Sequence, residues 1–232
     1  MARTSLTLRE RLELLELFRA HYAHVSRETF ERDLDAKHHV LLLRDPEGGI
    51  RGFTSMRLGE LVHQGRAIRT VFSGNTIIDP AHWGDMALVT TWCEFMAELK
   101  RERPHVALYW YLIASGFRTY LFLPLFFRRF TPKVGASADP FATSLLERLG
   151  NRDFPAEYAD GIVRPATPRE CLDPDLAIPT TRRLANPHVR FFLEANPGYL
   201  RGDELVCLAE YSFANTRRAA RAALERAREI AG

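Results

Sequence analysis

Two strand-like segments separated by a single helical pattern constrain the fold of this chain more than any other feature. Residues 67–79 are rich in β-branched and aromatic residues, and residues 105–114 form a nearly unbroken apolar run. Between them, apolar residues recur at intervals of three and four from Leu88 to Leu99, which is typical of an amphipathic helix. A strand, a helical crossover and a second strand predict two parallel neighbours in one sheet. Because the second strand is apolar on both faces, we expect it in the centre of that sheet.

Earlier segments supply two helices and two further strands. Residues 6–23 and 26–36 show helical patterns, the second with Ser26 as its expected N-cap. Residues 38–45 and 50–61 are predicted strands, which the turn sequences "DPEGG" and "HQGR" join to each other and to the third strand. The order helix, helix, three strands, helix, strand, helix predicts a mixed α/β sheet flanked by helices.

The chain after residue 130 is less regular and predicts an elaborated C-terminal part. We expect a helix at 141–149, a proline-rich loop at 155–187, a short helix from Pro187, a strand at 202–211 and a terminal helix at 215–230. The length of 232 residues, 46% of them hydrophobic, suits a single domain with a core at about residues 5–130.

Composition narrows the functional classes. The net charge of +3 and the lack of basic residues interleaved with aromatic ones disfavour nucleic-acid binding. Cys93, Cys171 and Cys207 are widely spaced and form no zinc-binding motif. The N-terminal segment is amphipathic, unlike a signal peptide. We therefore expect a reduced, cytoplasmic chain with no metal site.

The apolar window at residues 106–127 is long enough for a membrane span. Gly116, Arg118 and Pro124 interrupt it, and a central arginine costs roughly 2.5 to 3.5 kcal/mol on insertion scales. We interpret the window as a buried strand followed by a helix, with a membrane-spanning helix as the second interpretation.

The turn sequence "DPAHWGDMAL" connects the third strand to the long helix. Pro80 ends the strand, because proline has no N–H group for the strand ladder. The N-terminus of the following helix carries free N–H groups and the positive end of the helix dipole, which suit a phosphate. The turn is therefore a candidate anion site, although it also suits a purely structural link between strand and helix.

These elements and this turn resemble the GNAT acyltransferase superfamily. Its members share two helices, a three-strand meander, a long helix, a central strand and a further helix. Many carry a hydrophobic-Asp-Pro sequence and then, after two residues, Arg-Gly-x-Gly-x-Gly, which binds the pyrophosphate of coenzyme A. Here Ile-Ile-Asp-Pro at residues 77–80 and Gly84 match, and "SGF" at 115–117 is similar to a short sequence of the family core. The resemblance covers roughly residues 5–130 and implies a GNAT-like fold.

Three positions depart from the family pattern. Trp83 stands where arginine is usual, and Met86 and Leu88 stand where two glycines are usual. Their side chains narrow the approach of a phosphate to the backbone. The resemblance therefore implies a donor that is either acyl-CoA or an acyl carrier protein, whose pantetheine arm has a single phosphate. The residues expected to bind the donor are Gly74, Thr76, Trp83, Gly84, Asp85 and Met86.

Four residues are candidates for catalysis. Gly74 suggests a bulge or a close backbone approach, and Ser73 and Asn75 beside it are expected to share one face of the strand. They would orient an amine or a thioester carbonyl, unless neighbouring backbone groups satisfy them. The resemblance implies a tyrosine that protonates the leaving thiolate, and Tyr120 is the candidate, although it also suits a core. His82 lies nearest the donor turn and is a candidate general base, with water relays as the alternative.

Two further segments allow more than one interpretation. Residues 120–130 are strongly apolar and suit a core, the lining of a tunnel for a long acyl chain, or contact with a membrane surface. The arginine-rich helix at 215–230 suits a solvated face or an acidic partner such as an acyl carrier protein.

We predict an N-acyltransferase that moves an acyl group from an acyl-CoA or acyl-carrier-protein thioester to an amine of an amino acid or peptide. The resemblance implies direct transfer in a ternary complex, and a fatty acyl group is one option. The alternative is a catalytically inactive GNAT-fold module that binds an acyl group or a partner protein. A third possibility is a peripheral membrane protein.

Overall fold

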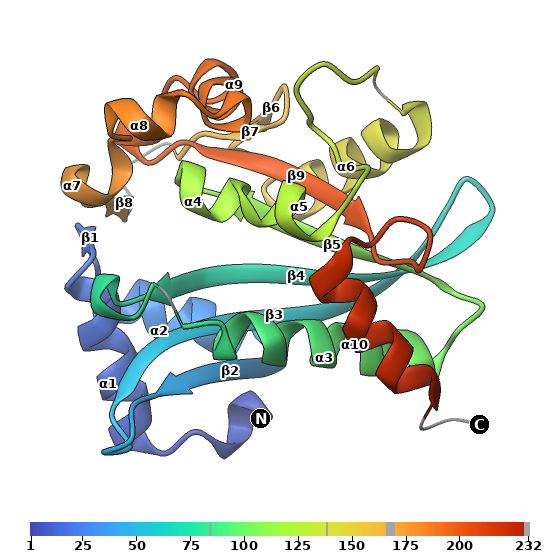
Figure 1. The fold of residues 1–232 in the computed structure, drawn as a ribbon. Coiled ribbons are helices and arrows are strands. Elements are labelled where there is room, and N and C mark those ends of the chain that lie inside the picture. Colours follow the sequence, from blue (N-terminus) through green and yellow to red (C-terminus); the bar gives the residue numbers. More distant parts are fainter. Residues whose placement is uncertain (84, 138, 166–169, 230–232) are drawn as a thin grey trace.

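A seven-stranded mixed sheet forms the centre of the computed structural model, which describes residues 1–83, 85–137, 139–165 and 170–229 (Figure 1). The sheet order is β2-β3-β4-β5-β9-β7-β6. The strands are β2 (His39–Arg44), β3 (Ile50–His63), β4 (Arg66–Ile78), β5 (Ala107–Ala114), β6 (Tyr158–Ala159), β7 (Ile162–Val163) and β9 (Glu204–Glu210). β4 and β5 are parallel, and the other neighbours are antiparallel. The predicted mixed sheet, with parallel third and fourth strands, is confirmed.

Helices cover both faces of this sheet (Figure 1). On one face, α3 and α10 pack with Trp110 of β5 in one apolar cluster. On the other face, α1 and α2 cover one end and α6 covers the other, where Tyr109 and Tyr111 lie. The alternation of side chains along β5 therefore divides these aromatics as the sequence predicts. The bounds are α1 (Leu8–Arg19), α2 (Arg27–Asp35), α3 (Ala87–Glu102), α6 (Pro140–Asp153) and α10 (Arg218–Glu229).

Local sequence signals set the helix ends beside the sheet. Thr7 caps α1 in a capping box with Glu10. Ser26 accepts a hydrogen bond from the N–H of Thr29 and caps α2, as predicted. After β4 the chain forms a 3-10 turn, η2 (Pro80–His82), and α3 begins at Ala87. Gly84 lies outside the described residues.

The chain after residue 130 completes the central sheet. β9 pairs with β5 from Leu205 to Glu210, and β7 extends the sheet from β9. The segment predicted as a loop at 155–187 contains short strands and single-turn helices. The remaining elements are η1 (Arg3–Ser5), β1 (Tyr22–Ala23), α4 (Phe117–Tyr120), α5 (Phe122–Phe126), β8 (Cys171–Leu172), α7 (Pro174–Ala177), α8 (Thr181–Leu184), α9 (Pro187–Ala195) and η3 (Tyr199–Arg201).

The apolar window at 106–127 lies in the interior, as β5 followed by α4 and α5. The single helix expected after the strand is two short helices in the structure. Among the described helices, none combines the length and apolar character needed to cross a membrane. This agrees with the interpretation of the window as a strand followed by helical structure.

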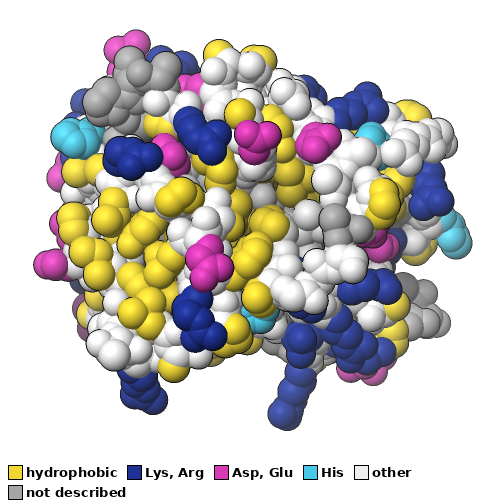
Figure 2. Space-filling model, turned by 90° about the horizontal axis from the view of Figure 1, so that it is seen from above, with side chains coloured by type: hydrophobic (Ala, Val, Ile, Leu, Met, Phe, Trp, Pro, Cys, Tyr) yellow, Lys and Arg dark blue, Asp and Glu magenta, His cyan; other side chains and the backbone are white. Residues whose placement is uncertain are grey.

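Apolar side chains on the surface gather away from residues 120–130. Within that segment Leu125 is exposed, but most of its large apolar side chains are buried. Ile178, Leu184 and Leu200 are exposed around α7, α8 and η3. Figure 2 shows hydrophobic side chains gathered on the side of the molecule where α7 and α8 lie in Figure 1. The predicted membrane contact through 120–130 therefore lacks the exposed surface that it requires.

Candidate active site

The parallel pair β4 and β5 separates part-way along its length. The pairing runs from Ile68 opposite Ala107 to Ser73 opposite Leu112. Beyond that point β4 follows β3 as far as Ile78, while β5 follows β9 as far as Ala114. A cavity of about 700 Å³ lies in the wedge between the diverging strand ends. The two strand ends separate because β4 stays paired with β3, whereas β5 stays paired with β9.

A β-bulge shapes the β4 side of the wedge. Phe53 lies opposite Ile77 and Ser55 lies opposite Gly74, so that Asn75 and Thr76 of β4 together oppose one residue of β3. Asn75 has a φ of +48°, in the left-handed region. A bulge adds one residue to one strand and reverses the alternation of side chains beyond it. The sequence predicted a bulge at the glycine of this segment, and the structure places it immediately after that glycine.

The bulge separates two side chains that were expected to share a face. Ser73 is buried and its hydroxyl accepts a hydrogen bond from the indole N–H of Trp110 at 2.9 Å, on the α3 face. Asn75 instead donates from Nδ2 to Oδ2 of Asp33 at 2.6 Å, toward α2. The predicted shared face is therefore wrong, because simple period-two alternation does not hold through a left-handed bulge residue. Both residues nevertheless line the cavity.

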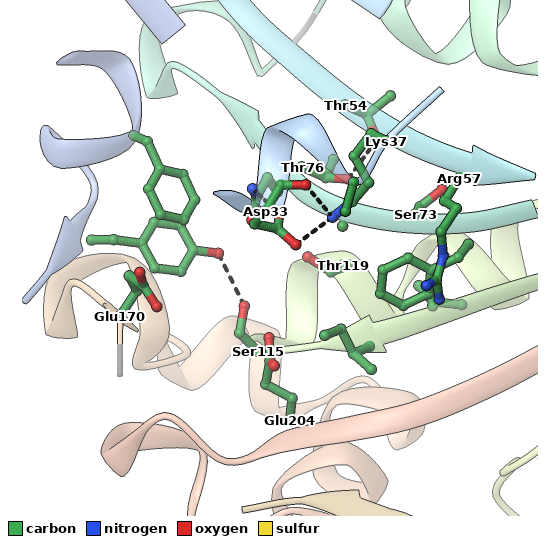
Figure 3. Close-up of a pocket in the computed structure, with 18 of the residues that line it drawn as sticks. Asp33, Lys37, Thr54, Arg57, Ser73, Thr76, Ser115, Thr119, Glu170 and Glu204 are labelled. Atoms are coloured by element: carbon green, nitrogen blue, oxygen red, sulfur yellow. Dashed lines mark hydrogen bonds and ion pairs between the residues drawn. The ribbon is translucent and has the colours of Figure 1, made fainter. Parts of the chain in front are cut away.

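A buried lysine lies against the bulge. Lys37 follows α2 and is 3% exposed, and its ammonium donates to the Asp33 carboxylate at 2.5 Å and to the Asp33 carbonyl at 3.2 Å (Figure 3). The ammonium also lies 5.5 Å from the centroid of the Phe72 ring. Burial lowers the pKa of Lys37, and the negative charge of Asp33 opposes that effect.

A second ion pair borders the same cavity. The guanidinium of Arg57 lies 5.2 Å from the Phe72 centroid and donates to the carboxylate of Asp153 at 2.5 Å. Lys37 and Arg57 thus place two cations beside one aromatic ring, each with its own carboxylate. The cavity wall is therefore polar at these two ion pairs and apolar where aromatic side chains form it.

A tyrosine–serine pair and two acidic residues form another part of the cavity wall. The hydroxyls of Tyr22 and Ser115 lie 3.0 Å apart, and Figure 3 shows Glu170 and Glu204 close to them. Burial raises the pKa of Tyr22 to about 12, and the negative charges of Glu204 and Glu170 add to this effect. Tyr22 is therefore a neutral hydroxyl at ordinary pH. The carboxylates give this part of the cavity a negative potential.

The predicted donor turn lies beside the wedge. Some of its backbone N–H groups already donate hydrogen bonds to side chains of the same turn. Asp79 accepts from the N–H of Ala81 at 2.9 Å, and Asp85 accepts from the N–H of Ala87 at 2.7 Å, in the first turn of α3. Met86 is the N-cap of α3 and provides no side-chain cap. Gly84 lies outside the described residues. Of the predicted donor-binding residues, Gly74 and Thr76 line the cavity, and Trp83, Asp85 and Met86 are exposed beside it.

Arg118 of α4 contacts this turn, and sequence reasoning did not assign it to the site. Its guanidinium stacks 4.2 Å from the centroid of Trp83 and 4.7 Å from that of Phe117. Nε and Nη1 of Arg118 are buried and have no hydrogen-bond partner among the described residues. Burial lowers the pKa of Arg118, and the nearby positive charge of Arg183 lowers it further. The signal that could have found it is its position as the single charged residue in the apolar window.

Tyr120 and His82 lie outside the described lining of the cavity. Tyr120 is fully buried and donates from its hydroxyl to the carbonyl oxygen of Pro132 at 2.9 Å, and burial raises its pKa. It packs among aromatic side chains and is not one of the described residues that line the cavity. His82 is half-buried in η2 and is likewise outside the described lining. Neither lines the described part of the cavity, and their catalytic roles stay predictions.

The apolar segment 120–130 contributes mainly to the core. Leu123, Phe127 and Phe130 are buried away from the described cavity lining. Phe122 and Phe126 do line the cavity, and Phe126 stacks on Trp92 with centroids 4.9 Å apart. A tunnel formed by the whole segment is therefore excluded. In the described part of the chain, His, Cys, Asp and Glu side chains form no group of three that could hold a metal ion.

Comparison with known proteins gives similarity to solved structures only. No family model and no curated protein matches this sequence. A probable N-acyltransferase from Enterococcus faecalis has 15% identity and a TM-score of 0.42 over 54% of this chain and 31% of its own length. A GNAT family N-acetyltransferase from Escherichia coli, solved with CoA, has 15% identity and a TM-score of 0.35 over 47% of this chain and 60% of its own. A Trypanosoma brucei acetyltransferase has 20% identity and a TM-score of 0.38 over 58% of this chain and 95% of its own.

The topology of the chain itself decides the fold. Two helices, a three-strand meander, a long helix and a parallel central strand follow one another as the resemblance implies, and the third and fourth strands of this series splay apart. The chain has a GNAT-like fold. The GNAT-like core continues into a C-terminal part whose β9 lies next to the central strand.

Proposed function

We propose that this protein is an N-acyltransferase that moves an acyl group from a thioester of coenzyme A or of an acyl carrier protein to an amine. The observation that carries this proposal is the cavity of about 700 Å³ between the splayed ends of β4 and β5. The cavity adjoins a helix N-terminus on one side and carboxylates on another. It therefore combines an extended slot for a thioester arm with room for a second substrate.

The donor arm is proposed to lie in the wedge. Beyond Ser73, β4 is paired with β3 along one edge only in the described sheet, so its other edge faces the wedge. Unpaired backbone N–H and C=O groups need partners, and the two amides of a pantetheine arm can supply them in the manner of an added strand. The thioester carbonyl would then lie beside the bulge at Asn75. Backbone N–H groups there would polarise the carbonyl.

The phosphate end of the donor is proposed to lie at the rim formed by Trp83 and Arg118. The family arginine is absent from the turn, but Arg118 brings a guanidinium to the ring of Trp83 from α4. A guanidinium is a strong hydrogen-bond donor to phosphate oxygens, and Nε and Nη1 of Arg118 have no partner in the described structure. The N-terminus of α3 adds the positive end of its dipole.

The acceptor amine is proposed to approach from the part of the cavity that contains Tyr22, Ser115 and Glu170. A carboxylate attracts an ammonium group, and water or Glu170 would accept the proton that the amine must lose. The amine nitrogen then attacks the thioester carbonyl carbon. As the C–N bond forms and the C–S bond breaks, the thiolate leaves with the electron pair of the C–S bond and takes up a proton from solvent. An amino acid or a peptide amine fits this chemistry.

A medium or long acyl chain is proposed to occupy the aromatic part of the cavity. Phe30, Phe72 and Phe154 line it on the α2 and α6 side of the sheet. Each buried methylene contributes roughly 0.8 kcal/mol, so a chain that reaches this wall would bind more tightly than an acetyl group.

The experiment that tests the proposal is thiol release from acyl thioesters of graded length, supplied as CoA and carrier-protein forms, with and without a panel of amino acids and peptides. Mass spectrometry of the acceptor identifies an amide product. Acceptor-dependent thiol release supports the proposal, and its absence with all donors and acceptors would contradict it.

One observation favours a second candidate, a binding module without catalysis. The carboxylate of Asp85 already accepts from the N–H of Ala87 at the N-terminus of α3, where a phosphate would have to bind. A negative charge at that position disfavours an anion. The two candidates differ in that a binding module would show saturable acyl-thioester binding by calorimetry with no turnover in the same sample.

A further inference from the structure

The ammonium of Lys37 is the most enclosed charge in the wall of the candidate active site. Lys37 follows the end of α2. Its side chain lies against the bulge of β4 and is almost fully buried. A buried ammonium is unfavourable unless it is paired, and an apolar side chain of similar length would fill the same space. The position of this charge in a substrate-sized cavity therefore requires a functional explanation.

The hydrogen bonds of Lys37 leave one donor for a ligand. An ammonium has three N–H groups. The two contacts to Asp33, through the carbonyl oxygen at 3.2 Å and Oδ1 at 2.5 Å, use two of them. The third N–H group is thus available on the side of the ammonium that the Asp33 contacts leave open.

The absence of a side chain at position 74 leaves the ammonium next to the main chain of the bulge. A Cβ atom placed on Gly74 would lie 3.3 Å from Cε and 3.4 Å from Nζ of Lys37. Asp33 also accepts from Asn75 through Oδ2 at 2.6 Å, so one carboxylate holds both the lysine and the bulge residue. The cation and the bulge are therefore fixed relative to each other, as Figure 3 shows for Asp33 and Lys37.

We propose that the Lys37 ammonium donates a hydrogen bond to the carbonyl oxygen of the bound thioester and stabilises the negative charge that develops on it. This proposal rests on the proposed acyl transfer. When the amine attacks, the π electron pair of the carbonyl moves to the oxygen, and it returns when the C–S bond breaks. Lys37 acts only as a hydrogen-bond donor and transfers no proton, and the Asp33 carboxylate accepts from the same ammonium. Asp33 is a positioning residue that aims the third N–H group.

The charge of Lys37 acts mainly on the transition state. A donor that is already in place before charge develops needs no reorganisation, and removal of one such donor from an enzyme typically lowers kcat by about 10²- to 10³-fold. The ground-state carbonyl carries little charge, so the affinity for the donor should change much less. A merely structural lysine would alter stability and would not produce this separation of kcat from KM.

The test compares Lys37→Met and Lys37→Gln with the wild type, and Lys100→Met serves as the matched control. Lys100 is another partly enclosed lysine, bonded to the carbonyl oxygen of Val106 at 2.8 Å, and it is not part of the described cavity lining. We expect kcat to fall by about 10²-fold or more in Lys37→Met, less in Lys37→Gln, and by less than about threefold in Lys100→Met. The donor KM should change by less than about threefold in all three. A kcat in Lys37→Met within about threefold of the wild type would overturn the role of Lys37.

A rescue experiment separates charge from packing. Lys37→Cys treated with 2-bromoethylamine carries an ammonium at nearly the original position, and treated wild-type protein controls for Cys171, the half-buried cysteine. Recovery of kcat supports the proposal, and a folded, fully alkylated protein without recovery overturns it. Should every Lys37 variant unfold, the carbonyl ¹³C resonance of a labelled donor bound to wild-type protein decides, with a downfield shift expected and an unchanged position overturning it. Absence of turnover in the wild type would overturn the acyl-transfer proposal itself, an outcome distinct from turnover that persists without Lys37.

Discussion

The guanidinium of Arg118 lies 4.2 Å from the ring centroid of Trp83, although the two residues are 35 positions apart and belong to different elements. This contact places a cation beside the turn after β4, which has tryptophan at the position where the GNAT pattern has arginine. Because Trp83 also donates from its indole N–H to the carbonyl oxygen of Ile78 at 2.9 Å, its ring is fixed at the end of β4. The ring of Trp83 is therefore a fixed surface on which the guanidinium of Arg118 stacks.

Replacement of Arg118 by methionine is expected to weaken CoA binding by about tenfold or more, because hydrogen bonds to charged groups contribute roughly 1.5 to 3 kcal/mol. Stability should not fall, since Nε and Nη1 of Arg118 are buried without partners in the described structure. Calorimetric titration with CoA and thermal melting measure the two quantities. Arg182→Met, which alters an exposed arginine of α8, is the matched control. An unchanged Kd in Arg118→Met would rule out this phosphate contact.

Gly74→Val is expected to lower kcat and to cost roughly 1 to 3 kcal/mol of stability through overpacking. The added Cβ would lie 3.3 Å from both Lys37 and Phe72, and the branched side chain would displace the ammonium. Steady-state kinetics and denaturant unfolding provide the measurement. If activity stays at the wild-type level while stability falls, the position of the lysine does not matter for transfer.

Chain-length preference should respond to Phe154 and not to Leu123. Phe154 lines the aromatic part of the cavity, where the acyl chain is proposed to lie, whereas Leu123 is fully buried in the core outside the described lining. Leu123→Ala should therefore cost about 2 to 5 kcal/mol of stability and leave the ratio of long-chain to acetyl transfer unchanged. Phe154→Ser should alter that ratio with a smaller loss of stability. Transfer rates across donors of increasing length, with melting curves beside them, would refute this assignment if Leu123→Ala alone changed the ratio.

The capping box of α1 predicts a contribution to acid sensitivity. Hydrogen bonds from the backbone N–H and hydroxyl of Thr7 lower the pKa of Glu10, and Arg44 adds to the effect. A carboxyl whose pKa is lower in the folded state than in the unfolded state stabilises the fold above its unfolded pKa, and this stabilisation is lost as pH falls through the folded pKa. Urea unfolding at pH 7 and pH 3 should show a smaller pH dependence in Glu10→Gln than in the wild type. Equal pH dependence would show that Glu10 contributes nothing.

Many of the helices and strands were predictable because short stretches of sequence specify them. Pro80, the apolar run of β5 and the helical spacing between them indicate a strand–helix–strand crossover, the connection that parallel neighbours require. Gly74 likewise marked the position of the bulge to within one residue. Ser26 predicted the start of α2. Each of these inferences uses residues close together in the sequence.

The site itself depended on contacts between distant residues, and there the sequence was less informative. Lys37 follows α2 and meets the bulge only in the folded chain, through Asp33 and Asn75. The left-handed φ of Asn75 moves its side chain to the opposite face, which period-two alternation cannot anticipate. Tyr120 was assigned by analogy, but α4 ends after four residues and directs it into the core.

The most direct test of the account is acceptor-dependent thiol release by wild-type protein, measured with CoA and carrier-protein thioesters from acetyl to long-chain acyl groups. We predict saturable release that requires an amine, yields an amide product of matching mass and increases with chain length. Thioester binding without any acceptor-dependent release would contradict the central claim and identify the protein as a binding module.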